Sequence, residues 1–592
     1  MKALYIYKKV ILPVCISVVG LLSSCSAFDD FLTVYPTNQI TGEQFWENKT
    51  DLESVLFACY RQMASDAMGE RMFAWGELKS DNFDLADTSS DNLVNLMTAN
   101  LLPINSWFSW ASFYKLIGYC NLSLSKGPEV LSKDNSFSEG DWLPIQAELV
   151  TMRALSYFYL VRAFRDVPFT VDANDTSVGA TDPMPQVPSE QILTYLINDL
   201  EAIKDNGMTN YGNDADNHGR ITRNAIYTLL ADIYLWRASK NSSPDSIAVY
   251  GDQYRDDYAK CIECCNYVIN AMNYKMNEQG VNHFGKGDGN TPELPLIVME
   301  PRSTAFTSYN EVFGSKNSDE SIFEVQYGNS PNDNETLNYF FGGFSGSNIT
   351  GARIQRSTVF EEVSTTEVEN EGVTFYKSDY RLGQTFYYAP ATNGTTIPIN
   401  IVKNLASGIT VNSAASTRDD MTTRGCFTYS GTRPHNNIAA NWIVYRASDP
   451  ILMKAEAMAA LSSFDASYLA SAMQLTKAIF IRSNPTIQAN RLNFFYGTQS
   501  EVMDYILRER QREFIGEGKR WFDLVRLAYR SGDTSRLLNI LSLKFAGGSN
   551  AIKAKMATMN SLFNPVYREE MKVNTALVQN PAWGDDNTSE RN

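Results

Sequence analysis

The chain has 592 residues, of which 44% are hydrophobic and 20% are charged, a composition typical of a globular protein. It excludes a collagen-like, a largely disordered and a multi-span membrane protein. Aspartate and glutamate outnumber lysine and arginine by 67 to 51, which gives a formal net charge of −16. Because such a chain repels phosphate backbones, nucleic acid is not an expected partner.

The first 24 residues have the features of a lipoprotein signal peptide. A lysine-containing start precedes an apolar run, 11–22, which is too short to span a bilayer as a helix. The run ends in Leu-Ser-Ser before Cys25, which resembles a bacterial lipobox. We therefore expect cleavage before Cys25 and lipidation of its thiol, which would anchor the protein to a membrane. The acidic residues within 26–30 resemble a surface-export signal of Gram-negative lipoproteins, although a solvated linker has the same composition.

Apolar residues recur at spacings of three and four in several segments of the mature chain, which predicts amphipathic helices. Small residues alternate there with large aromatic ones, a pattern similar to tetratricopeptide-type helix pairs, with an unrelated helical array as the alternative. The predicted helices are 147–165, one capped by Ser189 and running to 203, one opened by Thr222 and running to 236, 254–274, 448–461, 465–482, 499–514 and 518–530.

The stretch 278–445 is rich in glycine, asparagine, serine and threonine and has no helical period. It predicts long loops and a few short strands, and a stretch of this length is usually functional when it is ordered. The expected fold is therefore mostly α, a helical scaffold that carries a large irregular insertion.

Two local patterns suggest metal or redox chemistry, and neither has the remaining residues that such a site needs. Cys261 and Cys264 form a C-x-x-C pair, but they lie in a helical stretch without a second pair, so helix packing is the favoured interpretation. The segment 214–219 imitates the start of a calcium-binding EF-hand loop, yet its twelfth position is Ala225 instead of glutamate. We expect no metal and no cofactor.

Several segments together resemble the SusD/RagB family of nutrient-binding outer-membrane lipoproteins. The most specific is 508–526, RERQREFIGEGKRWFDLVR, which looks like the family's ER-x2-E-x2-EG-x-RWFDLVR segment. The others are the mature start around 31–46, the W-x3-Y-x2-I-x3-N pattern of 110–121, the RA-x2-YF segment from 153 with its Val-Pro at 167–168, NWIVYRASDPILMKAEA at 441–457, and QNPAW at 579–583. The middle of the chain, about 278–430, matches the family poorly.

This resemblance implies a domain organisation and a function. The expected parts are a signal peptide (1–24), an N-terminal SusD-like helical part with tetratricopeptide-type pairs (25–277), and a C-terminal part (278–592). The C-terminal part comprises the loop-rich 278–445, the helical 446–535 and an extended tail. A SusD-like protein is a non-enzymatic receptor, lipid-anchored to the outer membrane and exposed at the cell surface. It binds nutrient oligosaccharides and delivers them to a partner TonB-dependent (SusC-like) transporter.

The charged residues of 508–526 allow a second interpretation, a catalytic carboxylate beside an arginine clamp. Opposite charges at spacings of three and four instead predict ion pairs that support helices, with a break at Gly516 and Gly518. We therefore assign this run a structural role.

Two stretches, 71–107 and 329–344, contain aromatic residues among polar ones, the combination that sugar recognition needs. Flat aromatic rings cover the apolar faces of sugars, and side-chain amides and carboxylates pair with the edge hydroxyls. Such aromatic residues are more usually part of the core, and capping or a turn also explains the polar pair. The candidate ligand contacts are Trp75, Asp81, Asn82, Trp107, Tyr339 and Phe341.

Three alternatives stay open at this point: the same architecture could bind peptides, act as a glycoside hydrolase, or serve as a tetratricopeptide scaffold that binds only protein. A hydrolase needs two carboxylates about 5–10 Å apart, and no pattern in the sequence singles out such a pair.

Overall fold

The computed structural model describes residues 45–86, 90–173, 183–289, 291–298, 308–314, 316–328, 331–345, 348–357, 359–363, 373–376, 379–387, 400–403, 409–411, 427–429, 439–484, 496–545 and 548–584. The predicted signal peptide and Cys25 lie outside these ranges.

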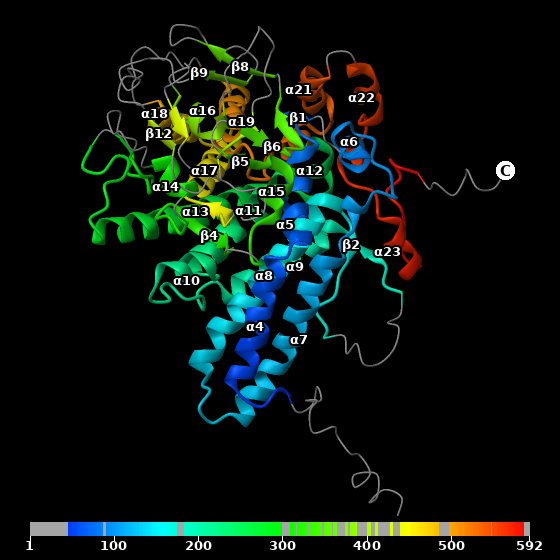
Figure 1. Cartoon of the computed structure of the whole chain (residues 1–592), viewed down its shortest axis with the longest axis vertical. Helices are drawn as coiled ribbons and strands as arrows, with labels where there is room; N and C mark the ends of the chain where they lie inside the picture. The colour runs from blue at the N-terminus through cyan, green and yellow to red at the C-terminus, as the bar shows by residue number, and fades with distance from the viewer. Residues whose placement is uncertain are drawn as a thin grey trace, which may run out of the picture.

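Long N-terminal helices form the narrow end of the molecule (Figure 1). They begin at residues that cap them: Asn48 accepts hydrogen bonds from the first turn of α4, and Ser138 does the same for α8. Gly127 of α7 is packed against Trp142 of α8, and a Cβ added to it would lie 2.1 Å from the indole. The helices of this part are α4 (Lys49–Met63), α5 (Asp66–Phe73), a π-helical turn (Ala74–Leu78), α6 (Asp91–Met97), α7 (Ala111–Lys133) and α8 (Glu139–Phe164).

A stack of paired helices follows, and the positions agree with the sequence prediction. Thr222 caps its helix as predicted, whereas Ser189 is the first residue of its helix instead of the cap. Cys261, Cys264 and Cys265 are buried in one of these helices, which confirms the packing interpretation of the C-x-x-C pair. The helices are α9 (Ser189–Ile203), α10 (Asp214–Gly219), α11 (Arg223–Asn241), α12 (Pro244–Tyr250) and α13 (Gln253–Glu278).

The late helices complete the frame by packing against this stack. α17 contacts α13, α18 and α19, and α20 contacts α11. α19 and α20 are separated at Gly516 and Gly518, whose φ angles of 78° and 72° favour glycine, so the predicted break is confirmed. The four helices are α17 (Ser448–Leu461), α18 (Ser467–Ser483), α19 (Gln499–Phe514) and α20 (Arg520–Ser531).

The irregular middle contains short strands, as predicted, and three short helices that periodicity did not reveal. Every sheet that the described residues form has two strands, and β4 pairs with β14 at the end of the stretch. The helices are α14 (Ser308–Gly314), α15 (Glu335–Phe341) and α16 (Tyr380–Thr385). The strands of this stretch are β4 (Ser321–Val325), β5 (Gly343–Ser345), β6 (Asn348–Thr350), β7 (Ile354–Arg356), β8 (Phe360–Val363), β9 (Val373–Tyr376), β10 (Phe386–Tyr387), β11 (Asn400–Ile401), β12 (Ile409–Val411), β13 (Phe427–Tyr429) and β14 (Trp442–Arg446).

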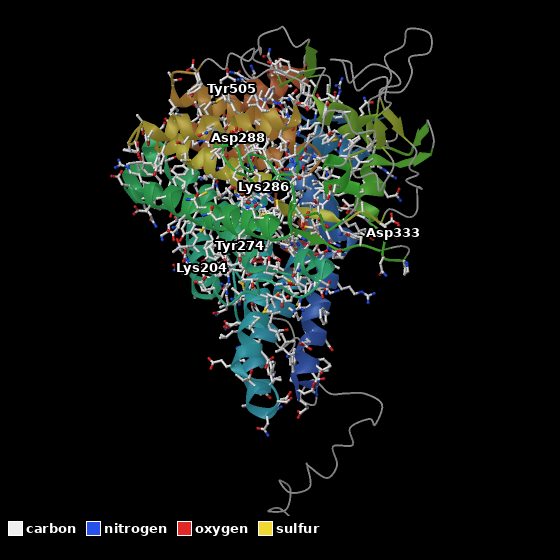
Figure 2. All side chains as sticks on the ribbon, turned by 90° about the vertical axis from the view of Figure 1, so that its left-hand side faces the viewer. Lys204, Tyr274, Lys286, Asp288, Asp333 and Tyr505 are labelled. Carbon is white, nitrogen blue, oxygen red and sulfur yellow. The ribbon has the colours of Figure 1, made fainter. Side chains whose placement is uncertain are left out.

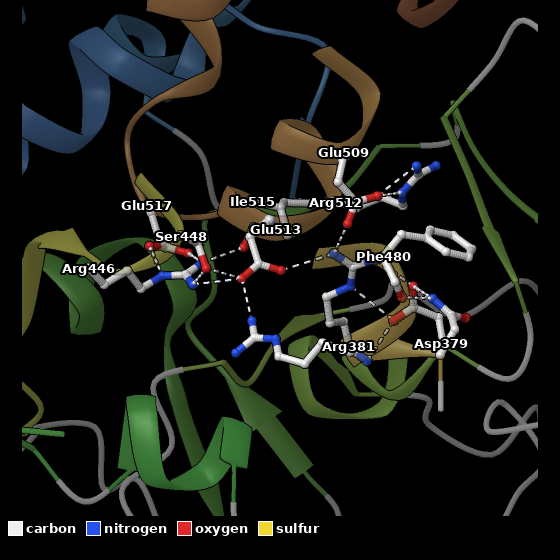
Figure 3. A network of polar contacts seen from close by, with 12 residues as sticks. Asp379, Arg381, Arg446, Ser448, Phe480, Glu509, Arg512, Glu513, Ile515 and Glu517 are labelled. Carbon is white, nitrogen blue, oxygen red and sulfur yellow. Dashed lines mark hydrogen bonds and ion pairs between the residues drawn. The ribbon is translucent and has the colours of Figure 1, made fainter. Parts of the chain in front are cut away.

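A buried network of ion pairs joins this middle stretch to α19 (Figure 3). Glu513 accepts hydrogen bonds from Arg446 and Arg482, and it also pairs with Arg381 at 3.0 Å. Lys403 donates to Glu517 at 2.5 Å. The carboxylates of the 508–526 run are thus occupied by buried cations, which agrees with its assignment as a structural segment.

The chain after 535 was expected to be extended, and it carries α21 (Ser535–Lys544), α22 (Ser549–Lys555) and α23 (Arg568–Val573), with a 3-10 turn at Met559–Leu562. Elsewhere β1 (Phe83–Leu85) pairs with β7, β2 (Val167–Pro168) pairs with β3 (Gln186–Val187), and a 3-10 turn spans Ser106–Phe108. Within the described ranges, no helix is long and apolar enough to cross a membrane.

Candidate functional site

Most of the predicted ligand contacts lie in the interior of the molecule. Trp75 and Asn82 are fully buried, and Phe341 is 1% exposed. Trp75 stacks on Phe113 at 4.9 Å, and its indole N–H donates to the Trp107 carbonyl at 2.8 Å. These side chains therefore support the frame, and their contact with a ligand stays a prediction.

The polar pair Asp81 and Asn82 is engaged with the late helices. Asp81 accepts hydrogen bonds from Arg520 at 2.8 and 3.0 Å, and Gln511 donates to both members of the pair. Burial alone would raise the pKa of Asp81, but the paired Arg520 guanidinium lowers it below its usual value. The carboxylate is thus held charged as part of an internal ion pair.

The structure nevertheless brings the two predicted stretches together. The Trp107 ring lies 5.7 Å from Tyr339 and 5.7 Å from Phe340, measured between ring centroids. Tyr339 is the least buried member of this aromatic cluster, and the Arg353 guanidinium lies 4.0 Å from its ring. Trp107 itself is 7% exposed. The cluster therefore presents one tyrosine ring and one cation at the surface.

A cleft of about 900 Å³ lies beside Asp66, the first residue of α5. Its walls come from α4, α7, α10, β4 and the segment Pro331–Asp333, which belongs to the second predicted stretch. Five aromatic residues line it: Phe57, Tyr60, Tyr119, Phe323 and Tyr327. Phe57 is 53% exposed, so its ring is available to a ligand from solvent.

The floor of this cleft is held rigid by an ion pair. Arg220 donates to both oxygens of Glu148, at 2.5 and 3.1 Å, and Tyr60 donates its hydroxyl proton to the same carboxylate. The Arg220 guanidinium also lies 4.1 Å from the Tyr211 ring and 5.6 Å from the Phe57 ring. Burial and the neighbouring Glu148 charge raise the pKa of Tyr60 well above its usual value, so it stays a hydrogen-bond donor.

α5 and α15 connect the cleft to the aromatic cluster, and they lie side by side (Figure 1). A Cβ added to Gly69 of α5 would lie 2.5 Å from the Thr336 hydroxyl oxygen of α15. Glu70 lies between the two ends and interacts with Asp66 at the cleft and with Arg353 at the cluster. We call the surface formed by the cleft, Tyr339, Trp107 and Arg353 the α5–α15 face.

The charges of the cleft balance, because Asp66, Asp216 and Asp333 line it together with Arg61, Lys115 and Arg220. Partial burial and then the charge of Asp333 raise the pKa of Asp66, and burial raises the pKa of Glu70. Arg71 and Arg353 partly offset these carboxylates. Such a face is suited to neutral ligands that carry hydroxyl groups, because its aromatic rings and polar groups alternate without one strong charge.

A model described as the SusD family matches residues 249–583, which is more than half of the chain. The chain belongs to the SusD family.

Relatives and solved structures agree with this assignment. The SusD-like protein P38 of Formosa agariphila is 24% identical over 522 residues, which cover 86% of this chain and 89% of that protein. A SusD homolog from Bacteroides thetaiotaomicron has a TM-score of 0.59 at 20% identity, with 91% of this chain and 99% of that chain covered. A laminarin-binding SusD-like protein has a TM-score of 0.59 at 19% identity, over 90% of this chain and 99% of that one. The expected mostly helical, SusD-like fold is thereby confirmed.

The sequence prediction missed the cleft of this SusD-family protein. Phe57 is on α4, where the buried stripe is formed by Leu52, Leu56, Cys59 and Met63, and it falls outside that stripe. An aromatic residue off the apolar face of a helix is a usable signal of a surface contact. The partners Glu148 and Arg220 are 72 residues apart, and no local spacing could have revealed their pairing.

Proposed function

We propose that this SusD-family protein is a cell-surface lipoprotein that binds nutrient oligosaccharides on the α5–α15 face. The observation that carries the proposal is the cleft of about 900 Å³, which is lined by the exposed Phe57 ring and by Arg220, whose guanidinium pairs with Glu148. A solved relative by fold is described as laminarin-binding, which supports a carbohydrate as the ligand class.

The mechanism of binding follows from the chemistry of sugars. Apolar C–H faces would rest on Phe57, Tyr119 and Tyr339, and edge hydroxyls would pair with Asp333, Asn332 and Lys115. These polar groups are partly exposed, so their pairing with a ligand replaces water instead of opening an internal ion pair. An open site of this kind binds a single oligosaccharide chain weakly. A transporter held beside the site would meet a raised effective concentration of that ligand.

The membrane anchor and the partner belong to the same proposal. Lipidated Cys25 would tether the protein to the outer membrane, and a SusC-like TonB-dependent transporter would import the captured ligand. Among the tetratricopeptide-type helix pairs, α17–α18 would offer a surface for that transporter. The protein would bind its ligand without catalysing a reaction, because capture and delivery require no covalent bond to break.

Calorimetry with the purified mature protein tests the ligand class. The panel contains laminarin oligosaccharides, other neutral oligosaccharides, an acidic glycan and peptides. We expect a neutral oligosaccharide to bind and Phe57→Ala to weaken it about tenfold, because the variant loses an aromatic contact. Tyr195→Ala is the matched control, since Tyr195 is 36% exposed on α9 and does not line the cleft.

Three outcomes would contradict the proposal. Binding of peptides alone would favour the peptide receptor, and hydrolysis of a bound oligosaccharide would indicate a glycosidase. Equal loss in Phe57→Ala and Tyr195→Ala would remove the cleft from the site.

A further inference from the structure

A second cavity, of about 570 Å³, lies beside the first on the opposite side of α10. Residues of α10 alternate between the two: Ala215, Asp216 and Gly219 line the first cleft, whereas Asn217 and His218 line the second cavity. The strand β4 divides in the same way, with Phe323 and Val325 on the first side and Ser321 and Ile322 on the second. α10 is therefore a ridge between two neighbouring cavities.

The loop before α10 is held in place by side-chain amides. Asn217 accepts a hydrogen bond from the Tyr211 backbone N–H at 2.6 Å and donates to Asn210 at 3.0 Å. Asn213 caps α10 by accepting from the backbone of Asp216 at 2.9 Å. The amide groups of Asn210, Asn213 and Asn217 are thus fixed in position before a ligand arrives, and Asn224 adds a fourth asparagine to the lining of the cavity.

The opposite wall is one face of α13. Tyr267, Ala271, Tyr274 and Glu278 line the cavity at helical spacings of four, three and four. Tyr267 is fixed by stacking on Tyr227 at 3.9 Å. Tyr274 is 65% exposed, and Figure 2 shows it at the surface, at a similar height to Asp333 of the first cleft. The wall therefore offers a fixed ring and an accessible ring, separated by the small side chain of Ala271.

His218 provides an unused hydrogen-bond acceptor at the base of the cavity. It is 4% exposed, and its Nδ1 lies 2.8 Å from the Ser321 carbonyl oxygen. Because a carbonyl only accepts, Nδ1 carries the proton and Nε2 presents a lone pair. Nε2 has no hydrogen-bond partner within the part of the chain that the structure describes. Burial lowers the pKa of His218 to about 4, so the ring is neutral at pH 7.

We propose that this cavity is a second sugar subsite, so that one extended neutral glycan lies across α10 with units in both cavities. The inference rests on the proposed function and adds the length of the ligand to it. Amides, two tyrosine rings and a neutral imidazole suit a ligand that both donates and accepts through hydroxyls.

The charges around the cavity disfavour an anionic ligand. Asp214, Glu278 and Asp319 carry negative charge there, and Lys275 is the positive group among the lining residues. Lys275 is already near Asp319, at 4.0 Å. A phosphate or uronate would therefore meet net repulsion, whereas a neutral sugar would not.

The geometry of the ridge sets the expected length dependence. A helix with its side chains is about 10 Å wide, so a ligand must exceed that span to reach both cavities. Short oligosaccharides would occupy the first cleft alone, and longer ones would gain affinity from the second without any change in the protein.

Calorimetry with laminarin oligosaccharides of increasing length, and with cello-, malto- and xylo-oligosaccharide series, tests the inference. We expect Tyr274→Ala to lower the affinity for the longest members about tenfold and to leave that for the shortest members unchanged. Asn224→Ala should act in the same direction. Tyr250→Ala is the control, because Tyr250 is 39% exposed on α12 and lines neither cavity.

The two proposals fail differently in this experiment. If the wild type binds no glycan of the panel, both are overturned. If the wild type binds but Tyr274→Ala and Asn224→Ala bind long and short members like the wild type, the second subsite alone is overturned. Both variants alter partly exposed side chains, and thermal unfolding of each confirms that the fold is retained.

Discussion

Arg446 and Glu513 form a fully buried ion pair, with Nη1 of the arginine 2.7 Å from Oε1 of the glutamate (Figure 3). The pair joins the end of β14 to the end of α19. Burial alone would raise the pKa of Glu513, but the guanidinium groups of Arg482, Arg446 and Arg381 hold it well below its usual value. The Glu513 carboxylate thus links three elements, α16, β14 and α18, to α19.

Removal of this carboxylate should destabilise the protein strongly. We expect Glu513→Gln to lower the free energy of unfolding by about 3–5 kcal/mol, because buried guanidinium groups would lose their counter-charge. Urea denaturation followed by circular dichroism measures the change. Glu569→Gln is the control, since its partner Lys572 is 62% exposed and such pairs contribute little. Equal stability of the two variants would contradict the structural role of the network.

The network also predicts a loss of stability in acid. Burial alone would raise the pKa of Glu517. The charges of Arg446 and Lys403 outweigh this effect and lower the pKa to about 2 in the folded state. A folded pKa below the unfolded value contributes stability that is present above about 4.5 and is lost as the pH falls through about 2. We expect up to about 3 kcal/mol from this group, because each pKa unit corresponds to about 1.4 kcal/mol. Unfolding measured from pH 6 to pH 2 should show a shallower decline in Glu517→Gln, and an unchanged slope would exclude this contribution.

Two glycines should respond to alanine in opposite directions. A Cβ at Gly76 would lie 1.7 Å from the Gly518 carbonyl oxygen, so Gly76→Ala forces α20 away from the π-helical turn. Gly118 of α7 has no atom within 4 Å of such a Cβ, and alanine is the better helix former by about 1 kcal/mol. We expect Gly118→Ala to raise the melting temperature and Gly76→Ala to lower it by several degrees or prevent folding. Similar melting temperatures for the two variants would contradict the close approach at Gly76.

If Cys25 is lipidated, its substitution should change the location of the protein in the cell and leave the fold intact. With Cys25→Ser the thiol that accepts the lipid is absent, so the protein should leave the membrane fraction. Fractionation of cells and mass spectrometry of the N-terminus measure this. Retention of the variant in the outer membrane would show that another segment anchors the chain.

The sequence predicted the helices well because each one carries its own periodic signal. Thr222 opens its helix in both prediction and structure, and the pairs Glu509–Arg512 and Asp523–Arg526 form at the predicted spacing of three. The long-range partners of the same run were not predictable. Arg381 reaches Glu513 over 132 residues, and no local pattern encodes such a contact.

The aromatic cluster of the candidate site was predictable in its segments and not in its side chains, and most of the cleft was not predicted. The stretches 71–107 and 329–344 do meet, at Trp107 and Tyr339. The pattern could not show which rings face solvent, because a π-helical turn at Ala74–Leu78 carries Trp75 into the core. Composition identifies aromatic residues, whereas their exposure depends on packing between segments that are far apart in the sequence.

Trp75 and Tyr339 are two of the predicted ligand contacts. Their alanine variants should therefore differ, one losing stability and the other losing ligand affinity. Trp75→Ala leaves a large cavity and should lower the free energy of unfolding by about 3–5 kcal/mol. Tyr339→Ala removes a partly buried ring and should cost less stability than Trp75→Ala, but it should weaken binding of the oligosaccharide identified by calorimetry by about threefold to tenfold. Denaturation and calorimetry on both variants distinguish these roles. If folded Trp75→Ala lost ligand affinity while Tyr339→Ala kept it, the ligand would contact the interior residue, and the α5–α15 face would have to open to admit it.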